Sequence, residues 1–155
     1  MVLGQVFSPK TIIVNLESED KDEVFEELVD SIISVQPQLN RTAAVEALQE
    51  RESKMSTGIV HGIAVPHGIT DSVNGVVRAI GISQKGIDYD ALDNAPVHLV
   101  FMLLISPEER EKHLQILSSL LKVLQNPNSV NLLMEKKSAK EVYDTLCAFE
   151  TKFFK

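Results

Sequence analysis

The sequence is poor in cysteine and has no tryptophan: Cys147 is the only cysteine among 155 residues. A single thiol leaves no intramolecular disulfide to form, which favours a reducing compartment over a secreted one. The first residues, MVLGQVFSPKTIIVNL, also lack the basic n-region and the unbroken apolar segment of a secretory signal. We therefore expect a cytoplasmic protein.

Long apolar runs and basic clusters are missing too. The longest apolar run, Leu99 to Ile105, is far shorter than the roughly 18 residues that suggest a membrane-spanning helix. The chain has 15 Lys and Arg against 22 Asp and Glu, a formal net charge of −7, and its longest basic cluster is Lys136-Lys137. Nucleic-acid binding normally requires a basic face. We therefore expect a protein that neither binds nucleic acid nor inserts into a membrane.

The length predicts one domain over residues 1–155, large enough to fold without disulfides or a structural metal. The hydrophobic periodicity gives the order β-α-α-β-β-β-α-α-α. The predicted strands cover residues 11–16, 63–65, 76–83 and 97–105, and the predicted helices cover residues 22–36, 40–54, 106–125 and 130–136 and a last segment that starts at residue 138. Because the strand at 97–105 is apolar nearly throughout, helices should cover both faces of the sheet. We predict an α/β fold, a three-layer α/β/α sandwich around a small mixed β-sheet of four or five strands.

Helix-start signals support this assignment. Asn40 or Thr42 is suited to cap the second helix. Ser106-Pro107-Glu108-Glu109 combines a Ser N-cap, a Pro at the first helical position and a Glu able to complete a capping box, and Ser138 to Glu141 forms a second such box. The segment from Ser106 is the clearest boundary in the chain.

The most informative stretch runs from Ser56 to Gly68, STGIVHGIAVPHG, and ends on an imidazole between Pro66 and Gly68. Proline fixes the backbone on one side of His67 and glycine frees it on the other. If residues 63–65 form a strand, His67 lies at its C-terminal end, where α/β sheets usually present functional groups. The alternative is a histidine that only caps a turn through local hydrogen bonds.

This stretch resembles the active-site signature S-T-G-x-G-N-G-x-A-x-P-H-G of the fructose/mannitol-type (type 2) enzyme IIA domains of the bacterial phosphoenolpyruvate-dependent sugar phosphotransferase system, a family that includes the nitrogen-regulatory IIA proteins. The resemblance covers nearly the whole chain. Its further segments are Arg51-Glu52, residues 86–93 (GIDYDALD), residues 97–104 and residues 111–114 (EKHL).

The resemblance implies that His67 is phosphorylated by the carrier HPr or an HPr-like protein, and passes the phosphoryl group to a IIB domain or signals through its phosphorylation state. It also implies catalytic roles for Arg51 and His113. An imidazole is partly neutral and nucleophilic near pH 7, a guanidinium matches two phosphate oxygens, and a histidine early in a helix donates a ring N–H. Without the resemblance, Arg51 is equally a solvated arginine and His113 a polar-face histidine.

Thr57, Gly68 and His61 are the remaining candidates for positions around the phosphate. The sequence departs from the signature at Val60, where Gly is usual, and at His61, where Asn is common. Valine does not readily adopt a positive φ, and His61 either replaces the Asn as a donor or titrates by itself. His98, inside the apolar strand, is interpreted as a structural histidine.

The sequence contains no clear motif for a metal or a nucleotide cofactor. Zinc bound by His61, His67 and His113 lacks a recognised ligand spacing and an acidic partner, and no nucleotide-binding glycine loop occurs. We expect no cofactor and no metal, and a phosphoryl group supplied by a protein. Two other functions stay open: a standalone regulatory IIA protein whose phosphorylation controls binding to a regulatory protein, and a noncatalytic relative that keeps only the fold.

Overall fold

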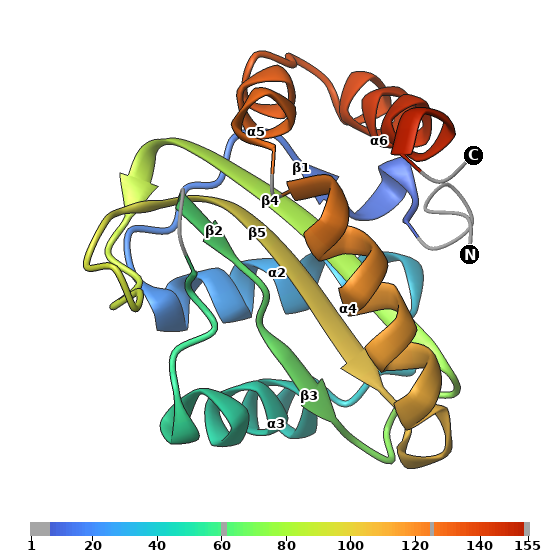
Figure 1. Cartoon of the computed structure of the whole chain (residues 1–155). Coiled ribbons are helices and arrows are strands. Elements are labelled where there is room, and N and C mark those ends of the chain that lie inside the picture. The colour runs from blue at the N-terminus through green and yellow to red at the C-terminus, as the bar shows by residue number, and fades with distance from the viewer. Residues whose placement is uncertain (1–6, 60–61, 125, 154–155) are drawn as a thin grey trace.

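The structure is a computed structural model that describes residues 7–59, 62–124 and 126–153. A mixed five-stranded sheet is covered by helices on both faces (Figure 1). The strands are β1 (Ile12–Ile13), β2 (Ile63–Ala64), β3 (His67–Ile69), β4 (Val76–Ile87) and β5 (Val97–Ile105). The helices are α2 (Lys21–Val35), α3 (Arg41–Lys54), α4 (Arg110–Leu124), α5 (Pro127–Met134) and α6 (Ala139–Phe153), with 3₁₀ turns η1 (Pro9–Thr11) and η3 (Pro107–Glu109).

The sheet order is β1-β4-β5-β2, and β3 also pairs with β5. β4 and β5 are antiparallel, whereas β1 pairs with β4, and β2 and β3 pair with β5, in parallel. β2 and β3 therefore follow one another along the same edge of β5. This arrangement confirms the predicted mixed sheet.

β5 is the centre of both cores because its side chains alternate between the two faces of the sheet. Leu99, Phe101 and Leu103 belong to the core beneath α4, α5 and α6. Val100 and Met102 belong to the core beneath α2 and α3. The three-layer prediction from the apolar run at 97–105 is thus confirmed.

Polar caps start the first two long helices. The Asp20 side chain accepts from the Glu23 amide at the start of α2, and the Asn40 side chain accepts from the Ala43 amide at the start of α3. The start at Ser106 differs from the prediction. Ser106 makes no side-chain cap hydrogen bond, and the chain turns through η3 before α4 begins at Arg110. Pro107 stands at the first helical position as expected.

Other boundaries also differ. The strand expected at 11–16 is only two residues long in the structure. It starts later than expected because Thr11 ends η1, where its hydroxyl donates to the Arg78 carbonyl. α5 begins at Pro127 because the Asn126 side chain accepts from the Asn128 amide, earlier than the predicted 130. A strand at 67–69 was not predicted, since Pro66 and Gly68 are typical of a turn. Pro66 fits this edge because it only accepts, from the Leu103 amide.

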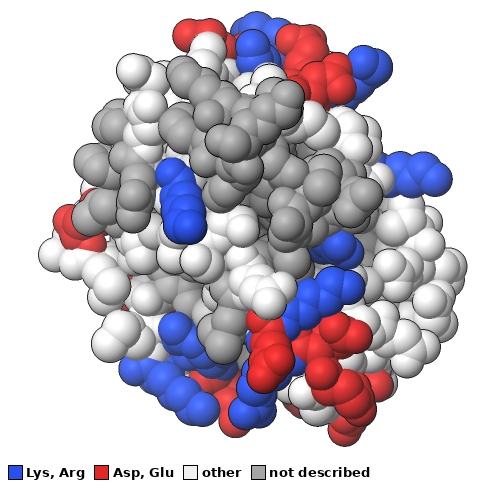
Figure 2. Space-filling model, turned by 45° about the vertical axis from the view of Figure 1, so that its right-hand side comes forward, with Lys and Arg blue, Asp and Glu red and all other residues white. Residues whose placement is uncertain are grey.

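Acidic and basic side chains gather side by side at the top and the bottom of the face shown in Figure 2. On the described part of this face, neither sign forms a uniform patch. Among the described helices, none combines the length and the apolar character that crossing a bilayer requires.

Candidate functional site

His67 is the first residue of β3, where it pairs with Leu103 of β5. His67 follows the C-terminal end of β2, as predicted for a strand at 63–65, and it also begins a further edge strand that was not predicted. Its ring is half-buried, and Nδ1 lies 2.9 Å from the Val65 carbonyl oxygen. Because a carbonyl only accepts, Nδ1 carries the proton in the neutral ring and Nε2 keeps its lone pair. The local backbone therefore fixes which ring nitrogen of His67 has the lone pair.

The surroundings of His67 favour the neutral ring. Burial lowers its pKa, and the positive charge of Arg51 lowers it further. The hydrogen bond to Val65 and the carboxylate of Glu52 act in the opposite direction. The net pKa lies below the usual value of 6.5, so the ring is mostly neutral at pH 7.

His113 lies in the first turn of α4 and packs against His67, with ring centroids 4.7 Å apart and an interplanar angle of 39°. It is buried, with 5% of its surface exposed, and its Nδ1 has no hydrogen-bond partner among the described residues. Burial, followed by the neighbouring His67, lowers the pKa of His113 to about 4. Buried polar atoms are usually hydrogen-bonded, so the unpartnered Nδ1 of His113 is an exception that marks this ring as a candidate ligand-binding group.

Arg51 approaches from α3 and lines a hollow of about 270 Å³ together with His67 and Gly68. Its guanidinium donates to the Met55 carbonyl, with Nη1 and the oxygen 2.8 Å apart. The structure thus brings Arg51, His67, His113 and Gly68 together from two helices and one strand. His61 lies outside the described residues.

Gly68 determines how closely α3 packs on β3. A Cβ at this position would lie 2.9 Å from the carbonyl carbon and the Cβ of Ala47, and 3.0 Å from the Leu48 amide nitrogen. Only glycine admits such a close approach of a helix backbone. The sequence predicted Gly68 to lie around the phosphate. In the structure Gly68 lines the hollow with His67, and its lack of a side chain sets how closely α3, which carries Arg51, approaches β3.

Thr57 belongs to a buried polar network just behind the site. Its hydroxyl contacts the Glu52 carboxylate and lies 2.8 Å from the Tyr89 hydroxyl, while its amide donates to Glu52. Glu52 also accepts from Tyr89 at 3.1 Å and pairs with Lys21 Nζ at 3.1 Å. Burial, and then the Glu52 carboxylate, raise the pKa of Tyr89, which keeps its hydroxyl protonated. The network ties α2, α3 and the β4–β5 connection to the segment that follows α3.

Sequence reasoning missed four residues of this region as site residues: Glu52, Tyr89, Lys54 and Arg110. Lys54 and Arg110 line the same hollow as His67. A spacing signal existed, because Lys54 follows Arg51 by three residues and Arg110 precedes His113 by three. Residues three apart share one helix face. Glu52 and Tyr89 are hydrogen-bonded although they lie 37 residues apart in the sequence, so no local sequence pattern predicts their contact.

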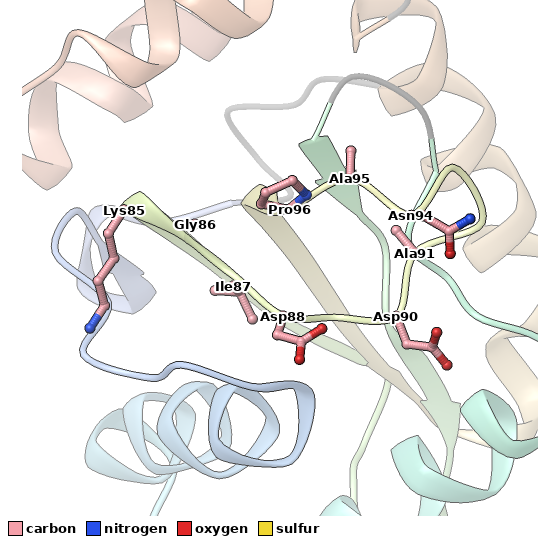
Figure 3. Close-up of a pocket in the computed structure, with 9 residues that line it drawn as sticks. All are labelled: Lys85, Gly86, Ile87, Asp88, Asp90, Ala91, Asn94, Ala95 and Pro96. Carbon is pink, nitrogen blue, oxygen red and sulfur yellow. The ribbon is translucent and has the colours of Figure 1, made fainter.

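A second hollow, of about 380 Å³, lies at the other end of β5 from His67 (Figure 3). Asp88 and Asp90 contribute carboxylates to it, and Lys85 and Asn94 line its ends. It adjoins the end of β4, where Ile87 pairs with Val97, whereas His67 pairs with Leu103 further along β5. Among the described residues, no group of three His, Cys, Asp or Glu side chains is arranged to hold a metal ion. His98 Nδ1 lies 2.8 Å from the Ser83 carbonyl oxygen, as expected of a structural histidine.

Residues 5–148 match the family "Phosphoenolpyruvate-dependent sugar phosphotransferase system, EIIA 2". The chain belongs to this family, as its signature predicted. It is 39% identical over 126 residues to the PTS system fructose-specific EIIA component of Haloferax volcanii, covering 81% of this chain and 82% of that protein. It is 37% identical over 147 residues to the fructose-specific EIIABC component of Bacillus subtilis, covering 94% of this chain but only 23% of that longer protein.

Solved structures share the fold. The nitrogen regulatory protein IIA-Ntr from Neisseria meningitidis superimposes with a TM-score of 0.86 at 30% identity, over 93% of this chain and 98% of that chain. IIA mannitol from Escherichia coli, solved in complex with phosphorylated IIB mannitol, gives a TM-score of 0.76 at 20% identity, over 92% and 97% of the two chains. At that identity the second likeness shows the fold alone.

Proposed function

We propose that this protein is a phosphohistidine carrier of the phosphoenolpyruvate-dependent phosphotransferase system. His67 accepts a phosphoryl group from HPr or an HPr-like protein and passes it to a IIB domain. The observation that carries the proposal is the orientation of His67: Nδ1 is engaged by the Val65 carbonyl, and the lone pair on Nε2 is left for phosphorus.

In the proposed step, Nε2 of His67 attacks the phosphorus atom of the donor's phosphohistidine. An N–P bond forms on His67 as the donor's N–P bond breaks, and the electron pair returns to the donor's ring nitrogen. Nδ1 keeps its proton, and the Val65 carbonyl stabilises the positive charge that the ring acquires. Arg51 compensates charge on the phosphoryl oxygens, and His113 supplies a ring N–H.

The partners are proposed on two grounds. Fructose-specific EIIA relatives align along most of the chain, and the complex of IIA mannitol with phosphorylated IIB mannitol has the same fold. A second candidate function is favoured by the likeness to IIA-Ntr: a regulatory IIA protein whose phosphorylation state controls binding to a regulatory protein. Transfer of label from the phosphorylated protein to a IIB partner distinguishes transport from regulation.

The test is labelling with radioactive phosphoenolpyruvate in the presence of enzyme I and HPr. We expect one labelled histidine in the wild type and none in His67→Ala. His98→Gln is the control, because His98 contacts the Ser83 carbonyl and does not line the hollow at His67. Label that persists on His67→Ala would disprove the assignment.

Arg51→Lys tests the site further. Lysine keeps the charge but loses the planar fork, so we expect transfer slower by about tenfold with an unchanged fold. Unchanged transfer kinetics would remove Arg51 from the site.

A further inference from the structure

The hollow that exposes His67 is unusually basic for this chain. Three cationic side chains line it, Arg51, Lys54 and Arg110, against one carboxylate, Glu50. The protein as a whole has a formal net charge of −7. Positive charge is therefore concentrated where His67 reaches the surface.

Two helices deliver this charge in the same way. Arg51 and Lys54 lie three residues apart on α3, and Arg110 and His113 lie three residues apart on α4. Residues at this spacing project from one helix face, with Cβ atoms about 5–6 Å apart. Since His113 stacks against His67 at 4.7 Å, Arg110 lies one turn from that contact and borders the same hollow.

The three cations are not neutralised within the structure. Arg51 donates to a backbone carbonyl, and no ion pair between described residues includes Arg51, Lys54 or Arg110. Lys54 and Arg110 are exposed. All three are therefore available to an anion that enters the hollow.

The charge on the ligand gives a reason for a second guanidinium. A phosphoryl group on His67 has two negative charges near neutral pH. His113 is largely neutral at that pH because burial lowers its pKa to about 4, so it contributes a donor but little charge. Arg51 alone compensates one charge.

We propose that Arg110 is a further phosphoryl-binding residue of this site, acting from α4 opposite Arg51 on α3, with Lys54 as a supporting cation. The inference rests on the proposed function, because it takes the His67 phosphoryl group as the ligand. Arg110 forms charge-assisted hydrogen bonds to the oxygens that Arg51 leaves free. Because Arg110 is exposed, solvent weakens its hydrogen bonds to the phosphoryl oxygens. We therefore expect its loss to lower phosphate affinity and the transfer rate by about three- to tenfold, less than the loss of a buried charge-assisted hydrogen bond.

The experiment compares Arg110→Gln, Arg110→Lys and the matched control Lys112→Gln. Lys112 is exposed, lies on the same helix two residues further on and does not line the hollow. Two quantities are measured: the affinity for inorganic phosphate, from NMR shifts of the His67 and His113 rings, and the maximal rate of phosphoryl transfer from HPr. Circular dichroism checks the fold of each variant.

We expect Arg110→Gln to weaken phosphate binding three- to tenfold and to lower the maximal rate by a similar factor, Arg110→Lys to be intermediate, and Lys112→Gln to match the wild type. The proposal is overturned when Arg110→Gln leaves both quantities unchanged, or when Lys112→Gln has an equal effect. If the wild type is not labelled by phosphoenolpyruvate but binds phosphate in an Arg110-dependent way, the proposed function fails while Arg110 keeps its role toward the anion.

Discussion

At the scale of single residues, the two imidazoles of the site are held neutral by the same cause. Both rings are withdrawn from water next to each other, and burial disfavours the charged form of each. Their hydrogen bonding differs: Val65 engages His67, whereas Nδ1 of His113 has no partner among the described residues. In the proposed transfer, the first arrangement leaves Nε2 of His67 as the attacking nitrogen, and the second leaves His113 with a ring N–H to donate.

The burial that the two rings share predicts a pH dependence. We expect the His113 ring to titrate with a pKa of about 4 and the His67 ring below 6.5, as followed by NMR of the imidazole carbons. Between about pH 4 and 6.5 these two histidines bind more protons in the unfolded chain than in the folded one. The free energy of unfolding should therefore fall as the pH falls through this interval. A midpoint for His113 at or above 6.5 would contradict the role of burial.

Glu52 provides a second prediction at this scale. Its buried carboxylate joins Lys21, Thr57 and Tyr89, so Glu52→Gln removes the ion pair with Lys21 and leaves that ammonium half-buried. We expect a loss of about 2 kcal/mol in the free energy of unfolding, measured in urea, because an uncompensated charge is costly to bury. The double variant with Lys21→Met should recover part of the loss. An additive double variant would show that the pair contributes no coupling.

At the scale of elements, the site depends on how three segments pack. β3 presents His67 at the edge of β5, α4 carries His113 above one face, and α3 carries Arg51 along the other (Figure 1). Gly68 lies at the contact of α3 with β3. The distance between these two elements therefore sets the position of Arg51 relative to His67.

Gly68→Ala tests this spacing. The added Cβ meets the backbone of Ala47 and Leu48, which must shift, so we expect destabilisation by about 1–3 kcal/mol and slower phosphoryl transfer. Gly81→Ala is the control. Its Cβ meets the end of the Leu16 side chain and no backbone atom among the nearest contacts, and a side chain can move aside more readily than a helix backbone, so the loss of stability should be smaller and transfer should be unaffected. Equal effects of the two substitutions on transfer would exclude the spacing role of Gly68.

At the scale of the whole molecule, one sheet joins two hydrophobic cores. Because β4 and β5 contribute side chains to both, neither helical layer can lose its packing without exposing the strands shared with the other. The charge distribution is also a property of the whole: the chain is acidic, and its hollow at His67 is basic.

We therefore predict a single cooperative unfolding transition. The chain has no tryptophan and two tyrosines, Tyr89 in the core under α2 and α3, and Tyr143 against the core under α4 to α6. Tyr143→Phe leaves Tyr89 as the only tyrosine fluorophore, and Tyr89→Phe leaves Tyr143. In each variant the urea midpoint from tyrosine fluorescence should coincide with that from far-UV circular dichroism. Separate midpoints would show that the layers unfold independently.

The amino-acid sequence by itself determined the family, the three-layer arrangement and the histidine signature. Local sequence patterns indicate these features: the apolar run on β5, helix caps such as Asn40, and the Pro66-His67-Gly68 triplet. Only the tertiary structure decided that His67 lies on a strand, that Gly68 spaces α3 from β3, and that Glu52 meets Tyr89. The physical reason is that these features depend on contacts between segments that are distant along the chain. The distance between their backbones sets which side chains meet, and a local sequence pattern does not contain that distance.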